Sequence, residues 1–171
     1  MIQGTKIHLR PLERDDLRQL RDWRNHPEIR SRTREYRLLN LENQEDWFAS
    51  LTHDRSTIML GIELPLAGTL IGVCGLTYID WRDQRSEVSL YLAPDQQGKG
   101  YGTDALQTLT GYAFTILNLH KLTAEIYSFN EASLNLFQKC GFTEEGRLRR
   151  HVYRLGQWCD SVMMARWRDE E

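Results

Sequence analysis

The sequence lacks the residue patterns of disulfide frameworks, metal sites and membrane spans. Its three cysteines, Cys74, Cys140 and Cys159, are odd in number and have neither metal-binding nor redox spacing. We therefore expect no bound metal and a reducing compartment. The first residues contain no apolar core of a secretion signal, and no hydrophobic run approaches the length that spans a bilayer. These absences predict a cytoplasmic protein with no membrane partner.

The chain also lacks an excess of charge of one sign. Its 22 basic and 24 acidic residues leave a net charge of −2, so no long-range field favours nucleic acid or a membrane surface as partner. The charge balance is locally uneven, because the segment from Arg10 to Arg37 contains nine arginines but only six acidic residues. Either a solvated helix face with ion pairs or an edge facing an anionic cofactor or acceptor explains this segment, since arginine suits phosphate and carboxylate.

A length of 171 residues with no repeat or low-complexity segment predicts one domain over residues 1–171. Apolar alternation predicts strands at residues 6–12, 57–64, 69–79, 85–92, 121–128, 143–153 and 158–167. Helical spacing predicts helices at residues 13–25, 43–51 (capped by Asn43), 101–116 and 130–140. The helix between residues 92 and 121 is a crossover that makes the flanking strands parallel. We expect an α/β fold with one mixed, mostly antiparallel sheet.

The stretch from Glu87 to Gly102 reads as a strand, a glycine-rich turn and the start of a helix. Unpaired N–H groups and partial positive charge at a helix N-terminus, together with glycines that admit a ligand closely, suit a phosphate. The nucleotide-triphosphate loop does not fit because Gly100 follows Lys99, and the dinucleotide fingerprint does not fit because the glycines are at positions 98, 100 and 102. A tight strand-to-helix connection without a ligand is the alternative.

Gln97, Gly100 and Gly102 form a Q-x-x-G-x-G pattern that resembles the acetyl-CoA pyrophosphate loop of the GCN5-related N-acetyltransferase (GNAT) superfamily. Three further segments, at residues 9–13, 112–121 and 130–142, resemble the Rim-type ribosomal-protein acetyltransferases and the spermidine acetyltransferases in the same order. The resemblance implies a single acetyltransferase domain with a sheet of six or seven strands, about four flanking helices and a parallel strand pair that splays apart in the middle.

The resemblance also implies acetyl-CoA as cosubstrate, with pantetheine in the split between the parallel strands. The residues it places on the cofactor are Leu90, Tyr91 and Leu92 beside pantetheine, Gln97, Gly98, Lys99, Gly100, Tyr101, Gly102 and Thr103 at the pyrophosphate, and Asn130 and Ser133 opposite. Exposed ladder groups at a strand split offer such partners. Asn130 can equally serve only as a helix cap.

Acetyl transfer to an amine needs an unprotonated amine, and an alkyl amine with a pKa near ~10.4 is mostly protonated at neutral pH. Glu87 is the candidate base by resemblance to Rim-type enzymes; the alternative is an edge carboxylate paired with Arg82 or Arg85. The tyrosine that protonates the leaving thiol in this superfamily corresponds to Phe137 here. Substitutes for this acid are Ser133, Cys140, Tyr127 or water. A covalent role for Cys140 is disfavoured, since it lies on an apolar helical stripe.

The acceptor expected first is a protein or peptide N-terminus. A polyamine comes second, because a polycation requires carboxylates in the cleft and the early arginines argue against them. An amino-sugar nucleotide comes third, since residues 23–27 resemble the opening of some amino-sugar acetyltransferases. A non-catalytic acyl-CoA-binding module and a structural adaptor are the other classes. The final hairpin is a candidate homodimer contact.

Overall fold

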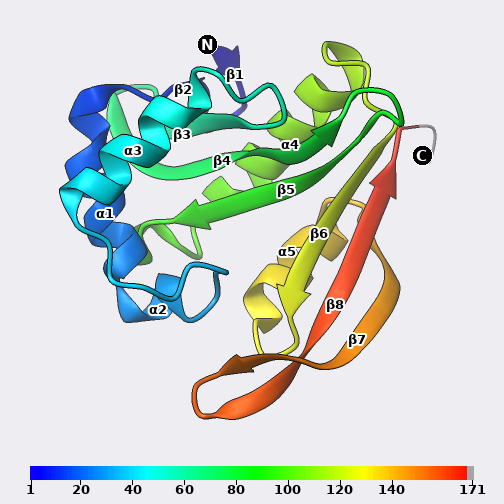
Figure 1. The fold of residues 1–171 in the computed structure, drawn as a ribbon. Helices are drawn as coiled ribbons and strands as arrows, with labels where there is room; N and C mark the ends of the chain where they lie inside the picture. The colour runs from blue at the N-terminus through cyan, green and yellow to red at the C-terminus, as the bar shows by residue number, and fades with distance from the viewer. Residues whose placement is uncertain (169–171) are drawn as a thin grey trace.

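The computed structural model describes residues 1–168 and contains one eight-stranded sheet with helices on both faces (Figure 1). The strands are β1 (Ile2–Gln3), β2 (His8–Pro11), β3 (Ile58–Leu64), β4 (Thr69–Asp80), β5 (Arg85–Leu92), β6 (Lys121–Tyr127), β7 (Thr143–Arg154) and β8 (Gln157–Trp167). Their order in the sheet is β1-β2-β3-β4-β5-β6-β8-β7. Every neighbouring pair is antiparallel except β5 and β6. The expected mixed sheet with its central parallel pair is confirmed.

The helices are α1 (Leu17–Asn25), α2 (Pro27–Arg30), α3 (Leu41–Leu51), α4 (Tyr101–Thr115) and α5 (Glu131–Lys139), with short 3₁₀ turns at Arg14–Asp16 and Pro94–Gln96. The described residues thus form eight strands and five α-helices, where the sequence predicted six or seven strands and about four helices. The elements missed are β1 and α2, which are two and four residues long. Elements this short carry no periodicity to detect.

Local signals explain α2 and the cap of α3, neither of which was predicted. The predicted helix end at Asn25 is confirmed, and Pro27 occupies the first turn of α2, where proline's fixed φ and missing N–H are tolerated. The Nδ1 atom of His26 accepts a hydrogen bond from the Glu28 amide at 3.3 Å and caps the new helix. Asn40, not Asn43, caps α3, and Asn43 instead completes a capping box with it.

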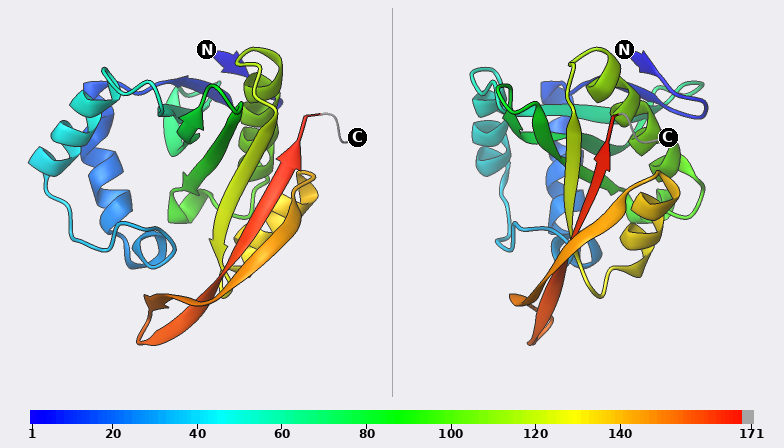
Figure 2. Two further views of the ribbon diagram at one scale, coloured as in Figure 1. Left: turned by 45° about the vertical axis from the view of Figure 1, so that its right-hand side comes forward. Right: turned by 90° about the vertical axis from the view of Figure 1, so that its right-hand side faces the viewer.

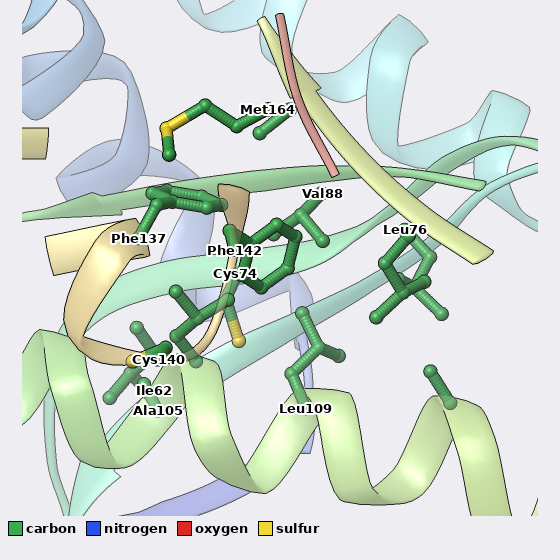
Figure 3. Packing of buried hydrophobic residues seen from close by; sticks show 14 of the residues in the cluster. Ile62, Cys74, Leu76, Val88, Ala105, Leu109, Phe137, Cys140, Phe142 and Met164 are labelled. Carbon is green, nitrogen blue, oxygen red and sulfur yellow. The ribbon is translucent and has the colours of Figure 1, made fainter. Parts of the chain in front are cut away.

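Apolar side chains form one layer on each face of the sheet. The larger cluster joins the strands to α4 and α5, and Figure 3 shows Phe137 and Phe142 packed within it. Their rings meet edge to face with centroids 4.9 Å apart. The second cluster packs α1 and α3 against β4, with Leu20 and Val73 buried at its centre. Figure 2 shows the two helical layers on opposite sides of the sheet, so β5 is covered on both faces.

The parallel strands β5 and β6 pair over only three residues. Their register is Arg85 with Lys121, Ser86 with Leu122, and Glu87 with Thr123. Beyond Glu87 the strands diverge (Figure 1), while β4 still pairs with β5 as far as Leu92 and β8 with β6 as far as Tyr127. Within residues 1–168, the facing edges of these two strands therefore have no strand partner beyond Glu87, which confirms the predicted splay.

The sequence argued against a disulfide framework and against a membrane span, and the structure provides an observation on each. Cys74, Cys140 and Cys159 are free and buried. None of the helices in residues 1–168 combines the length and the apolar character needed to cross a bilayer.

Candidate functional site

A cavity of about 890 Å³ lies in the wedge between the diverging strands. Residues 88–92 of β5 line one wall and residues 124–127 of β6 line the other. The glycine turn and the start of α5 close one end, and residues 32–35, which follow α2, close the other. The cavity thus connects a backbone-rich end with an end lined by charged side chains.

The glycine turn presents backbone amides to the first of these ends. Gly98 and Gly100 have φ angles of +74° and +83°, a region that glycine enters without a steric penalty. Gly100 is the N-cap of α4 and no side chain caps this helix. Within the described chain, the amides of residues 98–103 donate no hydrogen bond to protein groups. Such a set of free donors at a helix N-terminus fits a diphosphate.

Most of the predicted cofactor residues line this cavity. Those that do are Leu90, Tyr91, Leu92, Gln97, Gly98, Gly100, Gly102, Thr103, Asn130 and Ser133. Lys99 and Tyr101 lie outside the lining, because the Lys99 ammonium bonds Gln96 at 3.1 Å and the Tyr101 ring packs on the core. Asn130 does cap α5, since its Oδ1 accepts a hydrogen bond from the Ser133 amide at 3.4 Å. Both roles considered for Asn130 are therefore open to it.

Asp104 anchors the turn to the N-terminal segment and was not found from the sequence. Its buried carboxylate accepts hydrogen bonds from the amides of Thr5, Lys6 and Ile7 at 3.0, 2.6 and 3.0 Å. These bonds hold Lys6 beside the turn, where its ammonium lies 3.5 Å from the carbonyl oxygen of Lys99. A further positive charge therefore sits close to the free amides.

At the opposite end of the cavity, Glu87 faces a second carboxylate across the split. One guanidinium, that of Arg34, joins them: its two terminal nitrogens lie 2.7 Å from Glu87 Oε1 and 2.7 Å from Glu125 Oε2. In the described chain Glu87 pairs with Arg34 and with neither Arg82 nor Arg85, the partners named in the alternative interpretation of Glu87. The reason is that the segment after α2 folds back over the split and brings Arg34 to it.

Glu125 and Tyr78 complete this end and were missed by the sequence analysis. Burial acts to raise the pKa of Glu125, but hydrogen bonds from Ser161 and Arg34 hold it below its usual value. Tyr78 lies in a bulge of β4 with φ of +51°, and its ring is 5.7 Å from the Arg34 guanidinium. Bulges commonly redirect side chains beside functional sites. The alternation of residues 122–127 already placed Glu125 away from the core, so a signal for it existed.

The groups considered as proton donors to the leaving thiol differ in their surroundings. Phe137 lines the cavity and is buried, so no hydroxyl is present at the position resembling the family's tyrosine. The Tyr127 hydroxyl oxygen accepts a hydrogen bond from Arg154 at 3.0 Å, and burial raises the pKa of Tyr127. Burial also raises the pKa of the Cys140 thiol. A protonated, enclosed thiol is a poor nucleophile, in agreement with the sequence argument against Cys140.

Metal ligands are not gathered here: in residues 1–168 no group of three or more His, Cys, Asp or Glu side chains could hold a metal ion. What the site offers is a row of free amides, two unpaired strand edges and a pair of carboxylates. These groups can position a diphosphate, an extended amide-containing chain and a cation, respectively.

Comparison with known proteins agrees with this geometry. The sequence model of the acetyltransferase (GNAT) domain family matches residues 6–143. The spermidine N(1)-acetyltransferase of Vibrio cholerae is 31% identical over 161 residues, which cover 94% of this chain and 92% of that protein.

Solved structures of the V. cholerae enzyme are similar over almost the whole chain. The crystal structure of that enzyme in complex with CoA and spermine superposes with a TM-score of 0.92 at 30% identity, covering 96% of this chain and 97% of the other. A dodecameric structure of it gives a TM-score of 0.85 at 28% identity, covering 96% and 95%. The chain therefore belongs to the GNAT acetyltransferase family and is an acetyl-CoA-dependent N-acetyltransferase.

Proposed function

We propose that this enzyme transfers the acetyl group of acetyl-CoA to a primary amino group of a polyamine such as spermidine. The observation that carries this proposal is the carboxylate pair of Glu87 and Glu125, which already holds a cation. The carboxylates that line the cavity are Glu28, Glu35, Asp54, Glu87 and Glu125, and the cationic side chains that line it are Arg24, Arg32, Arg34 and Lys139. Because Arg32 and Arg37 pair with Glu28 and Glu35, the acids that remain for an acceptor are Asp54, Glu87 and Glu125. Three acids along one cavity suit an acceptor with several positive charges.

The early arginines, which favoured other acceptors over a polyamine in the sequence, do not make the cavity cationic. Arg32 bonds Glu28 at 2.8 Å, and Arg37 bonds Glu35 at 2.7 Å. Ion pairing within the segment thus cancels much of its positive charge. The relative from V. cholerae, whose structure contains CoA and spermine, supports the same acceptor class.

For acetyl-CoA we propose the residues expected from the sequence, on the observations above. The free amides of residues 98–103 and the nearby Lys6 would hold the diphosphate. The unpaired edges of β5 and β6 would hydrogen-bond the amides of pantetheine, with Asn130 and Ser133 on the opposite wall. Bound in this way, the cosubstrate supplies a thioester carbonyl as the acetyl donor.

Glu87 has the role of base in this proposal. The acceptor enters as an ammonium and loses one proton to Glu87, directly or through water. Its nitrogen then forms a bond to the acetyl carbon and loses its second proton as the amide forms, while the C–S bond breaks and the sulfur leaves with the bonding electrons as a thiolate. Since thiols have a pKa near ~8.5, the sulfur departs with little need of an acid, and Ser133 is the candidate to donate the proton that it takes up.

A protein or peptide N-terminus is the second candidate, because its α-amino group is also a single cation that Glu87 and Glu125 could pair. It predicts a different pattern of acceptors, since the remaining acids of the cavity would then be of no use. A homodimer through the β7–β8 hairpin remains a prediction, and the dodecameric V. cholerae relative supports some form of self-association.

An acceptor panel with acetyl-CoA tests the proposal. Free thiol release should be fastest with spermidine and spermine, slower with a monoamine such as propylamine, and slowest with a peptide that has a free α-amino group. The peptide as best acceptor would replace the polyamine by the second candidate. Heat on titration with CoA but no thiol release from any amine would indicate a binding module.

A further inference from the structure

The segment between α2 and α3 carries a cation into the end of the cavity assigned to the acceptor. Figure 1 shows this segment crossing from the α1 side toward β6. At its tip, Arg34 bridges Glu87 and Glu125 and lies over the ring of Tyr78. Two carboxylates and an aromatic face are the groups that recognise an alkyl ammonium. Arg34 thus makes the contacts that an acceptor amine would need.

The exposed fractions of the side chains show that the two carboxylates belong to the wall of the cavity and that Arg34 reaches them from outside. The Arg34 side chain is 48% exposed, whereas the side chains of Glu87 and Glu125 are 20% and 12% exposed. Glu125 is further fixed by Ser161, whose hydroxyl donates to its Oε1 at 2.6 Å. The carboxylates are therefore built into the strands, and the guanidinium approaches them from the solvent side.

The segment is tied down at its ends more firmly than at its tip. Asn25 bonds both backbone groups of Leu39, at 2.7 and 2.8 Å, and α2 fixes the other end. Between them, residues 31–40 contain no helix or strand. Apart from the contacts of Arg34, the described segment is joined to the rest of the fold by a 3.4 Å hydrogen bond from Arg154 to the Thr33 carbonyl and by the attraction between Arg24 on α1 and Glu35. Segments with so few anchors open at low free-energy cost.

We propose that Arg34 is a built-in competitor for the acceptor: its guanidinium occupies the subsite of Glu87, Glu125 and Tyr78, and the acceptor's ammonium displaces it. This inference rests on the proposed function, since it assumes an amine acceptor at that subsite. Two half-buried carboxylates without a cation would be unfavourable. Exchange between Arg34 and the substrate ammonium replaces one cation by another, so the carboxylates remain paired while the acceptor binds.

The exchange has consequences for both ends of the reaction. While Arg34 is paired with Glu87, the guanidinium occupies the carboxylate oxygen that would accept the proton, so Glu87 becomes available only when an amine displaces Arg34. Acetylation then converts the bound ammonium to a neutral amide, which no longer pairs with the carboxylates. Arg34 can return and displace the product. The same competition lowers the apparent affinity for the acceptor by the fraction of time that Arg34 occupies the subsite.

Arg34→Gln tests the proposal because it removes the competing cation and leaves both carboxylates. The experiment is calorimetric titration of spermidine into the enzyme without acetyl-CoA, followed by steady-state kinetics. We expect spermidine to bind about tenfold more tightly to Arg34→Gln, with KM lowered to the same extent, since the acceptor no longer has to displace the two ion pairs of Arg34. Ethylguanidinium should inhibit this variant more strongly than the wild type, and in competition with spermidine.

Arg21→Gln is the matched control, because Arg21 pairs with its neighbour Asp22 on α1 and does not line the cavity. It should bind spermidine as the wild type does. Arg34→Lys retains the charge but not the fork that spans two carboxylates, so about threefold tighter binding is expected. This second variant decides the question if the melting temperature shows that Arg34→Gln does not fold.

The two proposals fail in different ways. An active wild type whose Arg34 variants bind spermidine with unchanged or weaker affinity would overturn the competitor and leave the polyamine function standing. Loss of both affinity and melting temperature in the variants would mean that Arg34 only fastens the segment. If neither the wild type nor the variants released thiol with any amine, the proposed function would be wrong, and so would the proposal that Arg34 competes with the acceptor.

Discussion

Glu87 is the residue on which the proposed proton transfer depends. Glu87→Gln retains the size and hydrogen bonds of the side chain but cannot take a proton, so kcat should fall by about 100-fold or more. The affinity for CoA, measured by calorimetry, should not change, because the diphosphate is held at the other end of the cavity. Glu45→Gln on the exposed face of α3 is the control. Full turnover by Glu87→Gln would assign deprotonation to another group.

Cys140 is a residue whose substitution should leave the activity nearly unchanged. Its thiol is buried and its Sγ donates to the Thr103 carbonyl at 3.8 Å, and burial raises its pKa. We expect Cys140→Ser to keep kcat within about threefold of the wild type, because no covalent intermediate passes through it. Mass spectrometry of the wild type incubated with acetyl-CoA alone should show no acetylated cysteine. A stable acetyl-enzyme would reverse this assignment.

The sequence predicted Glu87 but not its partner, and the reason is the separation along the chain. The resemblance to Rim-type enzymes indicated Glu87, and strand alternation, a local signal, assigned it only to one face of its strand. The contact between Arg34 and Glu125 joins positions 91 residues apart and depends on an irregular segment. The bulge that turns Tyr78 outward gives no pattern at all in the sequence. Ion pairs between a loop and a distant strand, such as Arg34 with Glu125, therefore cannot be predicted from local sequence patterns.

Among the elements, the glycine turn before α4 makes the sharpest prediction. Gly100→Ala places a side chain at φ +83°, which costs about 1–2 kcal/mol and turns the free amides away from their present direction. We expect the CoA affinity to fall about tenfold and the CoA-induced rise in melting temperature to shrink accordingly.

Gly111→Ala is the control for this change. Gly111 lies in the same helix, exposed and with open space around its Cα. Alanine there should raise the stability by about 0.5–1 kcal/mol and leave CoA binding unaltered. Equal CoA affinity in both alanine variants would show that the turn does not hold the diphosphate.

Asp16 joins the turn before α1 to the sheet and gives the protein a defined acid dependence. Burial acts to raise its pKa, but bonds from Arg10 and from the Glu13 amide hold the pKa below the ordinary 3.8. A depressed pKa in the folded state means that its stabilisation is complete above pH 3.8 and is lost as the pH falls through the folded-state value. Asp16→Asn should lose about 1–2 kcal/mol at pH 7.

Urea unfolding at pH 7 and at pH 3 measures this difference. The gap in unfolding free energy between the wild type and Asp16→Asn should narrow at the lower pH, because below pH 3.8 the unfolded wild type binds a proton at Asp16 and the stabilisation from the Asp16 charge decreases. A gap of the same size at both values would mean that packing, and not the charge of Asp16, connects β2 to α1.

Strands and long helices were predicted within a few residues, because each repeats a two- or 3.6-residue pattern over several turns or pleats. The predicted parallel pair and its splay were right for the same reason, since a helical crossover leaves few other topologies. The exceptions were α2, which begins directly after α1 ends, and the cap of α3, where Asn40 and Asn43 are both residues that can cap a helix. Pro27 begins α2, which was not predicted, and Asn43 lies in the first turn of α3, three residues after the cap residue Asn40.

At the scale of the whole molecule, the cavity in the split of the sheet has two ends, one proposed for the diphosphate and one proposed for the acceptor. The cosubstrate end is made from contiguous residues 88–103 and was visible in the sequence. The acceptor end is assembled from α2, the following segment, β4 and β6. For this reason the sequence identified the reaction class, whereas the acceptor proposed from the structure, a polyamine, is the one that the sequence placed second.

The β7–β8 hairpin carries the last prediction, because it projects from the body of the molecule (Figure 2). Tyr153 and Trp158 are 56% and 62% exposed near its tip, with ring centroids 5.4 Å apart, and Leu155 at the turn is 72% exposed. The strand β7 is also the edge of the sheet. An unprotected edge beside apolar side chains favours contact with a second copy.

Sedimentation velocity at micromolar concentration should therefore show a dimer or larger assembly, and Trp158→Glu should shift it toward monomer. Leu66→Glu is the control, because Leu66 is equally apolar and fully exposed on the β3–β4 turn, away from this hairpin. A monomeric wild type, or an assembly unaffected by Trp158→Glu, would contradict the hairpin contact. Acetyl transfer should persist in a monomeric variant, since every side chain proposed for the site comes from one chain.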